Sequence, residues 1–170
     1  MKKILINSTV LSNFSAVNSL PLLQELYQVV YVAQAVYEET QDGLEEGYHF
    51  LAGINEFIHP FHTNGWLHLV NLEGETELTL YQQMPPKLHR GEAVSLAIAK
   101  HRQWGFLTDD QAARKHGNSM GVKISGTLGV LILSVKRGLI SHPQANTLLS
   151  KMIVLARYRS PVSSLDNFLK

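Results

Sequence analysis

Acidic side chains at three separate places in the chain are its most informative chemical feature. Glu92 lies at the start of an alanine-rich segment, Asp109 and Asp110 follow a short apolar run, and Glu38 and Glu39 form a third group far upstream. A cluster of carboxylates can neutralise a hard cation such as Mg²⁺, which prefers oxygen ligands, and can orient a water for attack. Metal-assisted hydrolysis is therefore the chemistry that these residue types favour, if the chain brings the three groups together.

An amide follows the first apolar segment of the chain, where a fourth acid would complete the pattern. The segment Ile4–Ile6 is followed directly by Asn7. An Asn side chain offers a carbonyl oxygen to a cation, but it supplies no negative charge and takes up no proton. We therefore expect metal binding to be weakened, although Glu38, Asp109 or Asp110 could compensate because two acidic groups contain a spare carboxylate.

Short apolar runs alternate with helical segments along the chain, which predicts a parallel sheet with right-handed crossovers. Strands are expected at residues 4–6, 29–32, 67–72, 106–108 and 122–124, and helices at 10–27 (interrupted near Pro21), 33–42, 44–57, 75–83, 91–103, 111–116, 126–137, 142–157 and 163–169. Ligands of such sheets gather beyond the carboxyl ends of the strands. The acidic groups could therefore meet at one edge of the sheet, although they are distant in the sequence.

The composition predicts one compact α/β domain over residues 1–170. The chain is 45% hydrophobic and 17% charged, carries a net charge of +1 and contains no cysteine. A chain of this size buries a full core without disulfides, and the lack of cysteine excludes thiolate metal sites. The apolar runs at the N-terminus and at residues 124–135 are too short for a signal peptide or for a spanning helix of about 20 residues. We expect a cytoplasmic protein that does not contact a membrane.

The order and spacing of four segments resemble the motifs of PIN-domain proteins. Residues 4–11 resemble the opening motif of that family, residues 32–39 its second acidic motif, and residues 91–93 and 107–110 the third and fourth. Residues 126–140 are similar to an uncharacterised prokaryotic subfamily that is distantly related to VapC-type toxins. Each motif is short, but together they cover nearly the whole chain.

This resemblance implies a three-layer fold, in which helices flank a central parallel sheet, and metal-dependent cleavage of phosphodiester bonds, usually in RNA. The positions that match the catalytic acids of the family are Asn7, Glu39, Glu92 and either Asp109 or Asp110. The ligands of Mg²⁺ or Mn²⁺ implied by this match are Glu39, Glu92 and Asp110. The Thr-x-Asp spacing favours Asp110 over Asp109, and the choice between them stays open.

Neighbouring polar and basic residues complete the expected site. Ser8, Thr9 and Thr127 could hydrogen-bond to carboxylates that hold the metal, although turn and cap roles suit these three residues equally well. The expected contacts to the nucleic acid are basic residues beside the acidic groups, namely Arg90, Arg114 and Lys115.

The leading hypothesis is a PIN-fold ribonuclease with activity weakened by Asn7, and the alternative is an inactive PIN-fold module that binds RNA or a protein. An active enzyme could be the toxin of a toxin–antitoxin pair, with a small antitoxin protein as its partner. The leucine-rich segments 20–26 and 148–155 could form a homodimer interface, although core packing explains them as well. A nucleotide-binding protein is disfavoured because no glycine-rich loop follows the first strand.

Overall fold

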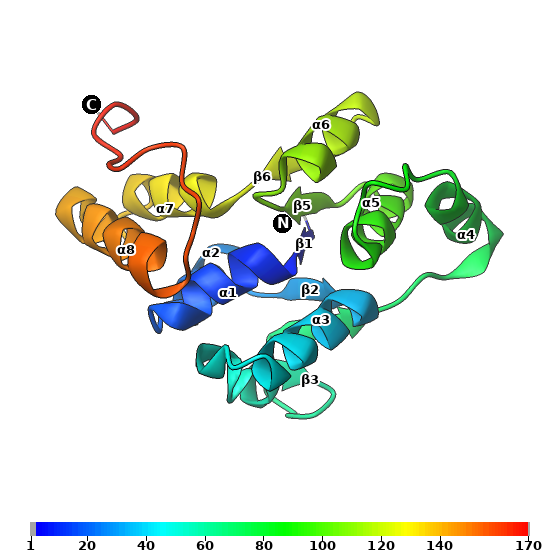
Figure 1. The fold of residues 1–170 in the computed structure, drawn as a ribbon, viewed down its shortest axis with the longest axis horizontal. Coiled ribbons are helices and arrows are strands. Elements are labelled where there is room, and N and C mark those ends of the chain that lie inside the picture. Colours follow the sequence, from blue (N-terminus) through cyan, green and yellow to red (C-terminus); the bar gives the residue numbers. More distant parts are fainter. Residues whose placement is uncertain (1–2, 170) are drawn as a thin grey trace.

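Parallel strands form the central sheet of the protein, whose computed structural model describes residues 3–169 (Figure 1). The six strands within these residues are β1 (Ile4–Ile6), β2 (Val30–Ala33), β3 (Ile58–His59), β4 (Leu67–Val70), β5 (Gly105–Leu107) and β6 (Lys123–Ser125). Their spatial order is β3-β4-β2-β1-β5-β6, and every pairing is parallel. Because Ile6 pairs with both Val32 and Leu107, strands β1, β2 and β5 end side by side at one edge of the sheet.

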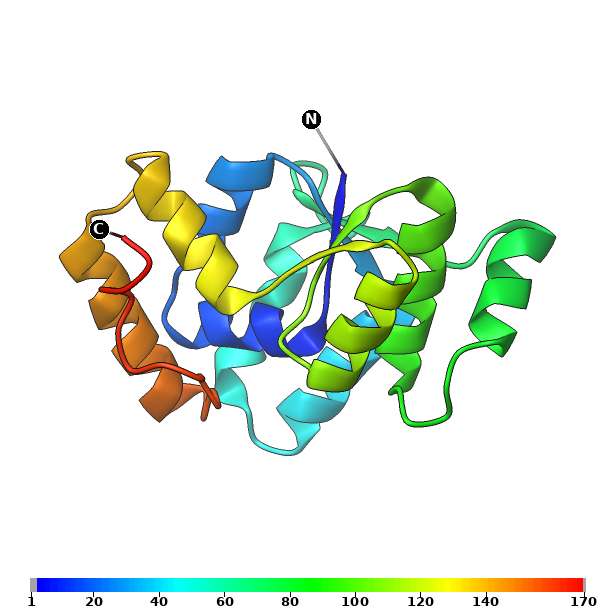
Figure 2. The same cartoon turned by 90° about the horizontal axis from the view of Figure 1, so that it is seen from above.

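Helices fill the crossovers between these strands and cover the sheet. They are α1 (Ser8–Ala16), α2 (Leu20–Tyr27), α3 (Gln34–Glu45), α4 (Gly74–Gln82), α5 (Arg90–Arg102), α6 (Gln111–Ser119), α7 (Thr127–Lys136) and α8 (His142–Leu155). Figure 2 shows α2, α7 and α8 on one side of β1 and α4, α5 and α6 on the other. The prediction of a central parallel sheet flanked by helices is confirmed. Across residues 3–169, every helix is too short or too polar to cross a bilayer.

Burial on both faces explains the sequences of the central elements. Strands β1 and β5 are nearly continuous apolar runs, as expected for parallel strands covered on both sides, and Leu5 and Phe106 are fully buried. Helix α5 contacts β1, β2 and β5 as well as the helices α3, α4 and α6. Its small and apolar side chains are buried around the whole circumference, from Gly91 to Ala99. This central helix carries Glu92 in its first turn and thereby holds the carboxylate under the carboxyl edge of the sheet.

Two of the predicted helices are wrong. Residues 44–57 contain the end of α3 and only the short 3₁₀ helices η1 (His49–Leu51) and η2 (Ile54–Phe57), because Gly47 and Gly53 adopt positive φ angles of 99° and 83°. Residues 163–169 are irregular, and the side-chain oxygen of Asn146 accepts a hydrogen bond of 2.7 Å from the backbone N–H of Leu165. The strand β3 was not predicted, since two residues are too few to show a pattern.

A buried ion pair joins α4 to α5. Glu77 is 1% exposed and accepts hydrogen bonds from Arg102 Nε at 2.6 Å and Arg102 Nη2 at 2.9 Å, and its Oε1 lies 3.0 Å from His101 Nδ1. Burial alone would raise the pKa of Glu77, but the hydrogen bonds from Arg102 and His101 lower it from 4.5 to about 2. The charged form of Glu77 therefore stabilises the folded protein.

Glu77→Gln should lower the free energy of unfolding at pH 7 by about 3 kcal/mol, because it removes the buried charge that pairs with Arg102 and leaves that guanidinium only the exposed Glu73 as an ionic partner within residues 3–169. The carboxylate contributes fully above the pKa of 4.5, and its contribution is lost as the pH falls towards 2. Urea unfolding between pH 7 and pH 3 measures the free energy of unfolding of the variant and of the wild type. The difference between the two free energies should become smaller as the pH falls. The control is Glu75→Gln on the exposed face of α4. Equal stability of both variants at pH 7 would contradict the prediction.

Candidate active site

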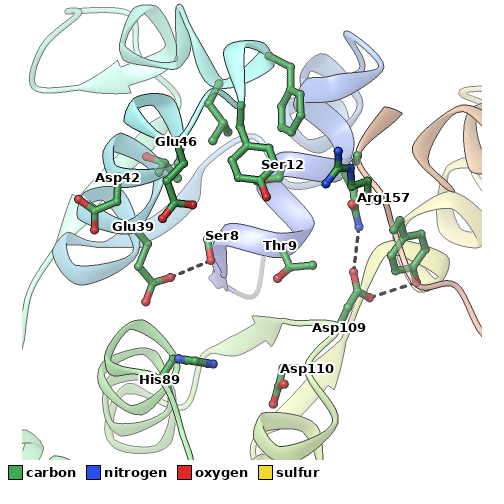
Figure 3. A pocket seen from close by; sticks show the side chains of 18 of the residues that line it. Ser8, Thr9, Ser12, Glu39, Asp42, Glu46, His89, Asp109, Asp110 and Arg157 are labelled. Carbon is green, nitrogen blue, oxygen red and sulfur yellow. Dashed lines mark hydrogen bonds between the residues drawn. The ribbon is translucent and has the colours of Figure 1, made fainter. Parts of the chain in front are cut away.

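A pocket at the carboxyl edge of the sheet brings the acidic groups together (Figure 3). Its volume is about 820 Å³, and its lining includes Glu39 from α3, Glu92 from α5, and Asp109 and Asp110 from the loop after β5. The four carboxylates come from three crossovers that are distant in the sequence, and they meet where β1, β2 and β5 end. This edge is where α/β sheets bind ligands.

The carboxylate of Glu39 is held by two hydrogen bonds from neighbouring elements. Ser8 Oγ donates to Glu39 Oε2 at 2.8 Å, and the backbone N–H of Gly91 donates to Glu39 Oε1 at 3.0 Å. Any side chain at position 91 would collide with this arrangement, because a Cβ there would lie 2.5 Å from Glu39 Oε1 and 2.9 Å from Val36 Cγ2. Gly91 therefore allows α3 and the start of α5 to approach closely enough to fix Glu39 in the pocket.

Glu92 is buried and keeps one oxygen free for a ligand. It is 6% exposed, and its Oε2 accepts a hydrogen bond of 3.2 Å from the backbone N–H of His89, which closes a capping box on α5. Among residues 3–169, no hydrogen-bond donor contacts the other oxygen. Burial raises the pKa of Glu92, and the negative charges of Asp110 and Glu39 raise it further. A cation between these carboxylates would relieve both the repulsion and the loss of hydration.

Asp110 also keeps an oxygen free. Its Oδ1 caps α6 by accepting a hydrogen bond of 2.8 Å from the backbone N–H of Ala113. Its Oδ2 has no hydrogen-bond donor within the described residues, and the side chain lines the pocket. Asp110 and Glu92 therefore present one available carboxylate oxygen each.

Asp109, by contrast, is saturated by hydrogen bonds. Its Oδ1 accepts from the backbone N–H of Thr127 at 2.9 Å and lies 3.5 Å from Tyr158 Oη, while its Oδ2 accepts from Thr127 Oγ1 at 2.6 Å and Asn13 Nδ2 at 3.2 Å. Burial raises the pKa of Asp109, and the hydrogen bonds from Thr127 oppose that rise. A Cβ at position 126 would collide with Asp109 Oδ1, so Gly126 is required for this approach. Asp109 fastens the loop after β5 to α1, α7 and the segment after α8.

Asn7 does not line the pocket. It is 2% exposed, its Oδ1 accepts a hydrogen bond of 3.0 Å from the backbone N–H of Val10, and its Nδ2 donates to Thr108 Oγ1 at 2.9 Å. Thr108 Oγ1 also accepts a hydrogen bond of 3.2 Å from the backbone N–H of Asp110. Asn7 therefore caps α1 and supports the loop that carries Asp110, and its side-chain oxygen is already used within the protein.

The other polar residues expected at the site differ in their placement. Ser8 and Thr127 donate to the carboxylates of Glu39 and Asp109, whereas Thr9 lines the pocket without a side-chain hydrogen bond inside the range 3–169. None of the three basic residues expected to contact nucleic acid lines the pocket: Arg90 pairs with Glu38 at 2.8 Å, Arg114 donates to the backbone oxygen of Thr108, and Lys115 is exposed on α6.

Several pocket residues were not predicted. Asn13 and Tyr158 contact Asp109 from positions 96 and 49 residues away, and no local pattern signals either contact. Tyr48, Arg157 and Arg159 form another part of the pocket wall. Arg157 and Arg159 lie far from the acidic motifs in the sequence, so nothing there connected these two basic residues with the site.

The donor set fits a divalent cation only in part. In the described part of the chain, no three acidic or histidine side chains stand close enough to hold an ion between them. The free oxygens of Glu92 and Asp110 remain, and Mg²⁺ is commonly bound through one or two carboxylates, with waters and substrate phosphates completing its shell. Each oxygen of Glu39 accepts one hydrogen bond and keeps a second lone pair, so Glu39 becomes a third ligand only if its side chain moves towards Glu92 and Asp110. The residues therefore suit an ion that is held weakly by the protein and more firmly with a phosphate.

A family model described as a PIN domain matches residues 3–170. No curated protein matches the chain in sequence.

Proposed function

Because the chain belongs to the PIN-domain family, whose members are nuclease-type proteins, we propose that it is a metal-dependent endoribonuclease. PIN domains generally use divalent metal ions. The observation that carries the proposal is the meeting of Glu39, Glu92, Asp109 and Asp110 in one pocket at the carboxyl edge of the sheet.

The four carboxylates would have different roles. Glu92 and Asp110 would hold Mg²⁺ or Mn²⁺ through their free oxygens, and Glu39 would join them if its side chain moved towards the ion. A bound ion would neutralise charge on the scissile phosphate and help to generate a nucleophilic hydroxide. Asp109 would keep the loop of Asp110 in place through Thr127 and Asn13, and it would not bind the ion itself.

The activity would be weak, because Asn7 supplies no charge and because Glu92 and Asp110 each offer the ion one oxygen without a hydrogen bond within residues 3–169. The same two observations favour the second candidate function, an inactive PIN-fold module that binds RNA or a protein. The two functions differ in whether the pocket binds a metal ion.

The roles as a toxin, as the partner of a small antitoxin and as a homodimer rest on the family resemblance. Leu20, Leu22, Leu23 and Leu26 of α2 are buried in the core of this chain and leave little surface for a partner. Helix α8 exposes Val154 by 74% and Leu155 by 54%. A dimer or antitoxin contact would therefore use α8 rather than α2.

Saturating Mn²⁺ should raise the melting temperature by about 5 °C, because ligand binding stabilises only the folded state. The same ion should support cleavage of a single-stranded RNA, and EDTA should abolish that cleavage. Thermal unfolding and gel analysis of a labelled RNA measure the two effects, with NaCl at matched ionic strength as the control. An unchanged melting temperature together with EDTA-resistant or absent cleavage would favour the inactive module.

A further inference from the structure

The wall of the pocket that faces the acids is aromatic and basic. Figure 3 shows Arg157 across the pocket from Glu39, with Asp109 on its own side. Tyr48 and Phe50 from η1 and its flank line the same cavity, together with Arg157, Tyr158 and Arg159 from the segment after α8. Aromatic rings and guanidinium groups therefore line one side of the pocket, where Glu46 and Asp109 lie beside them.

The aromatic and basic side of the pocket extends beyond the acidic site. A second hollow of about 430 Å³ adjoins the pocket, and its lining shares Glu46, Tyr48, Phe50 and Arg157 with that of the first. The two hollows thus meet at Tyr48. A ligand held at the carboxylates has a continuous path past this ring and along Arg157.

The ring of Tyr48 is placed for stacking. Tyr48 is 40% exposed, and its centroid lies 5.9 Å from that of Phe50 with an interplanar angle of 54°. Phe50 is only partly exposed and supports the tyrosine from one side. An exposed aromatic face can stack with an unpaired base, because every base has a π-face.

The two arginines are held outward by the residue between them. Tyr158 is 7% exposed, its backbone N–H donates to Met152 O at 3.2 Å, and its hydroxyl lies 3.5 Å from Asp109. Arg157 adopts a positive φ of 55° where α8 ends, and both Arg157 and Arg159 are exposed. Among residues 3–169, neither guanidinium has an ion pair or a side-chain hydrogen bond. Both charges are therefore available to phosphates and tied to the acidic site through Tyr158.

We propose that Tyr48, Phe50, Arg157 and Arg159 form a docking subsite for single-stranded RNA, in which a base stacks on Tyr48 and the arginines contact phosphates. This subsite rests on the proposed function, since it places the strand beside the carboxylates. A paired duplex keeps its bases stacked within the helix and cannot present one to Tyr48. Glu46 lines both hollows and repels phosphate, so the strand follows the arginine side of the groove.

Binding without catalysis tests the subsite separately from the nuclease. Fluorescence anisotropy in EDTA measures the affinity for a labelled 12-nucleotide RNA and for a duplex of equal length. We expect the single strand to bind at least about 10-fold more tightly than the duplex. Tyr48→Ala should weaken single-strand binding by about 10-fold, and Tyr48→Phe should restore it because the ring remains.

Arg157→Gln removes the charge, keeps two of the three methylenes and should reduce the slope of log Kd against log salt by about 0.7, the value for one phosphate contact on a single strand. The controls are Phe61→Ala, which removes another exposed aromatic ring, and Lys136→Gln, which removes an exposed charge at the far end of α7. Both should bind like the wild type. Thermal unfolding of each variant shows whether the fold is intact.

Three results would overturn the subsite: no RNA binding by the wild type, equal affinity for duplex and single strand, or unchanged binding by folded Tyr48→Ala and Arg157→Gln proteins. Unchanged binding by the two variants would indicate that this side of the pocket contacts a protein partner instead of RNA. If the variants behave as expected but Mn²⁺ supports no cleavage, the proposed nuclease fails and the docking subsite stands.

Discussion

Glu92→Gln should reduce Mn²⁺-dependent RNA cleavage by about 100-fold or more and leave the protein at least as stable as the wild type. The glutamine oxygen can still accept the hydrogen bond from the backbone N–H of His89, so the capping box of α5 is kept. The negative charge is lost, and with it the free carboxylate oxygen that Glu92 offers to the ion.

The expected gain in stability follows from the raised pKa of Glu92. Burial and the charge of Asp110 make the carboxylate less favourable in the folded protein than in the unfolded chain. This penalty is absent at low pH, where both states are protonated, and grows as the pH rises above the pKa of the unfolded chain. Gln carries no such penalty. The difference in melting temperature between variant and wild type, measured in EDTA, should therefore grow between pH 4 and pH 8.

Cleavage rates and thermal unfolding of the same protein preparations test both effects. The matched control is Glu25→Gln on the exposed surface of α2, which removes an equal charge outside the pocket. A Glu92→Gln protein that still cleaves RNA would overturn the role of Glu92. A variant that unfolds at a much lower temperature would show that Glu92 is structural instead.

Neutral substitutions of Asp109 and Asp110 should likewise distinguish a residue that stabilises the fold from one that binds the ion. Asp110→Asn should lose cleavage with an intact fold, because Asn caps a helix as well as Asp. Asp109→Asn should instead lower the free energy of unfolding by about 1–3 kcal/mol, because its amide would point an N–H at the donors of Thr127 or Asn13. Loss of cleavage without loss of stability in Asp109→Asn would contradict this division.

The elements that were predicted correctly are those that local patterns define. The apolar runs of β1, β2 and β5 are buried on both faces, and α5 follows a Gly-Glu start with small residues, so the sequence shows them directly. Residues 44–57 look helical because their apolar spacing is suitable, but Gly47 and Gly53 at positive φ break the chain into short turns. Here the backbone preference of glycine outweighed the hydrophobic pattern.

The sequence indicated which acidic residues line the pocket better than it indicated the hydrogen bonds that these residues make. The order of the polar groups along an alternating chain predicted that Asn7 and the acids could meet at one edge, and the acids line one pocket there whereas Asn7 does not. Which oxygens stay free depends on donors from distant segments, such as Asn13 and Tyr158 at Asp109. Those contacts arise from packing of α1 and the end of the chain around the loop after β5. A single sequence contains no local pattern that reports them.

Asn7→Asp should increase Mn²⁺ affinity and Mn²⁺-dependent cleavage by about 10-fold each. The new carboxylate can keep the hydrogen bond from the backbone N–H of Val10, since Asp caps helices as well as Asn. The Thr108 hydroxyl now accepts from Asn7, and it can turn to donate to Asp while its oxygen still accepts from Asp110 N–H. The substitution therefore adds a negative charge that is linked to the backbone of Asp110 through the Thr108 hydroxyl, and no hydrogen bond is lost.

The added charge should also change stability in a metal-dependent way. Without metal, a further buried carboxylate beside the loop of Asp110 loses hydration, increases repulsion and lowers the melting temperature. Bound Mn²⁺ relieves that repulsion, so the rise in melting temperature on adding Mn²⁺ should be larger in Asn7→Asp than in the wild type. Asn18→Asp, which adds the same charge at an exposed position beyond α1, should change neither the cleavage nor the response to Mn²⁺. Peptide mass spectrometry verifies that Asn7 has not deamidated in the wild-type sample.

The results for Asn7→Asp and Glu92→Gln have to be interpreted together. If Asn7→Asp cleaves no faster while Glu92→Gln abolishes cleavage, the amide at position 7 is not a defect, and the two free oxygens of Glu92 and Asp110 suffice for the ion. If Asn7→Asp cleaves RNA faster, the missing negative charge at position 7 limits the cleavage rate of the wild-type protein, although the side chain at this position does not face the pocket. In that case the buried network of Asn7, Thr108 and Asp110 sets the metal affinity, because it decides how much negative charge lies behind the ligands.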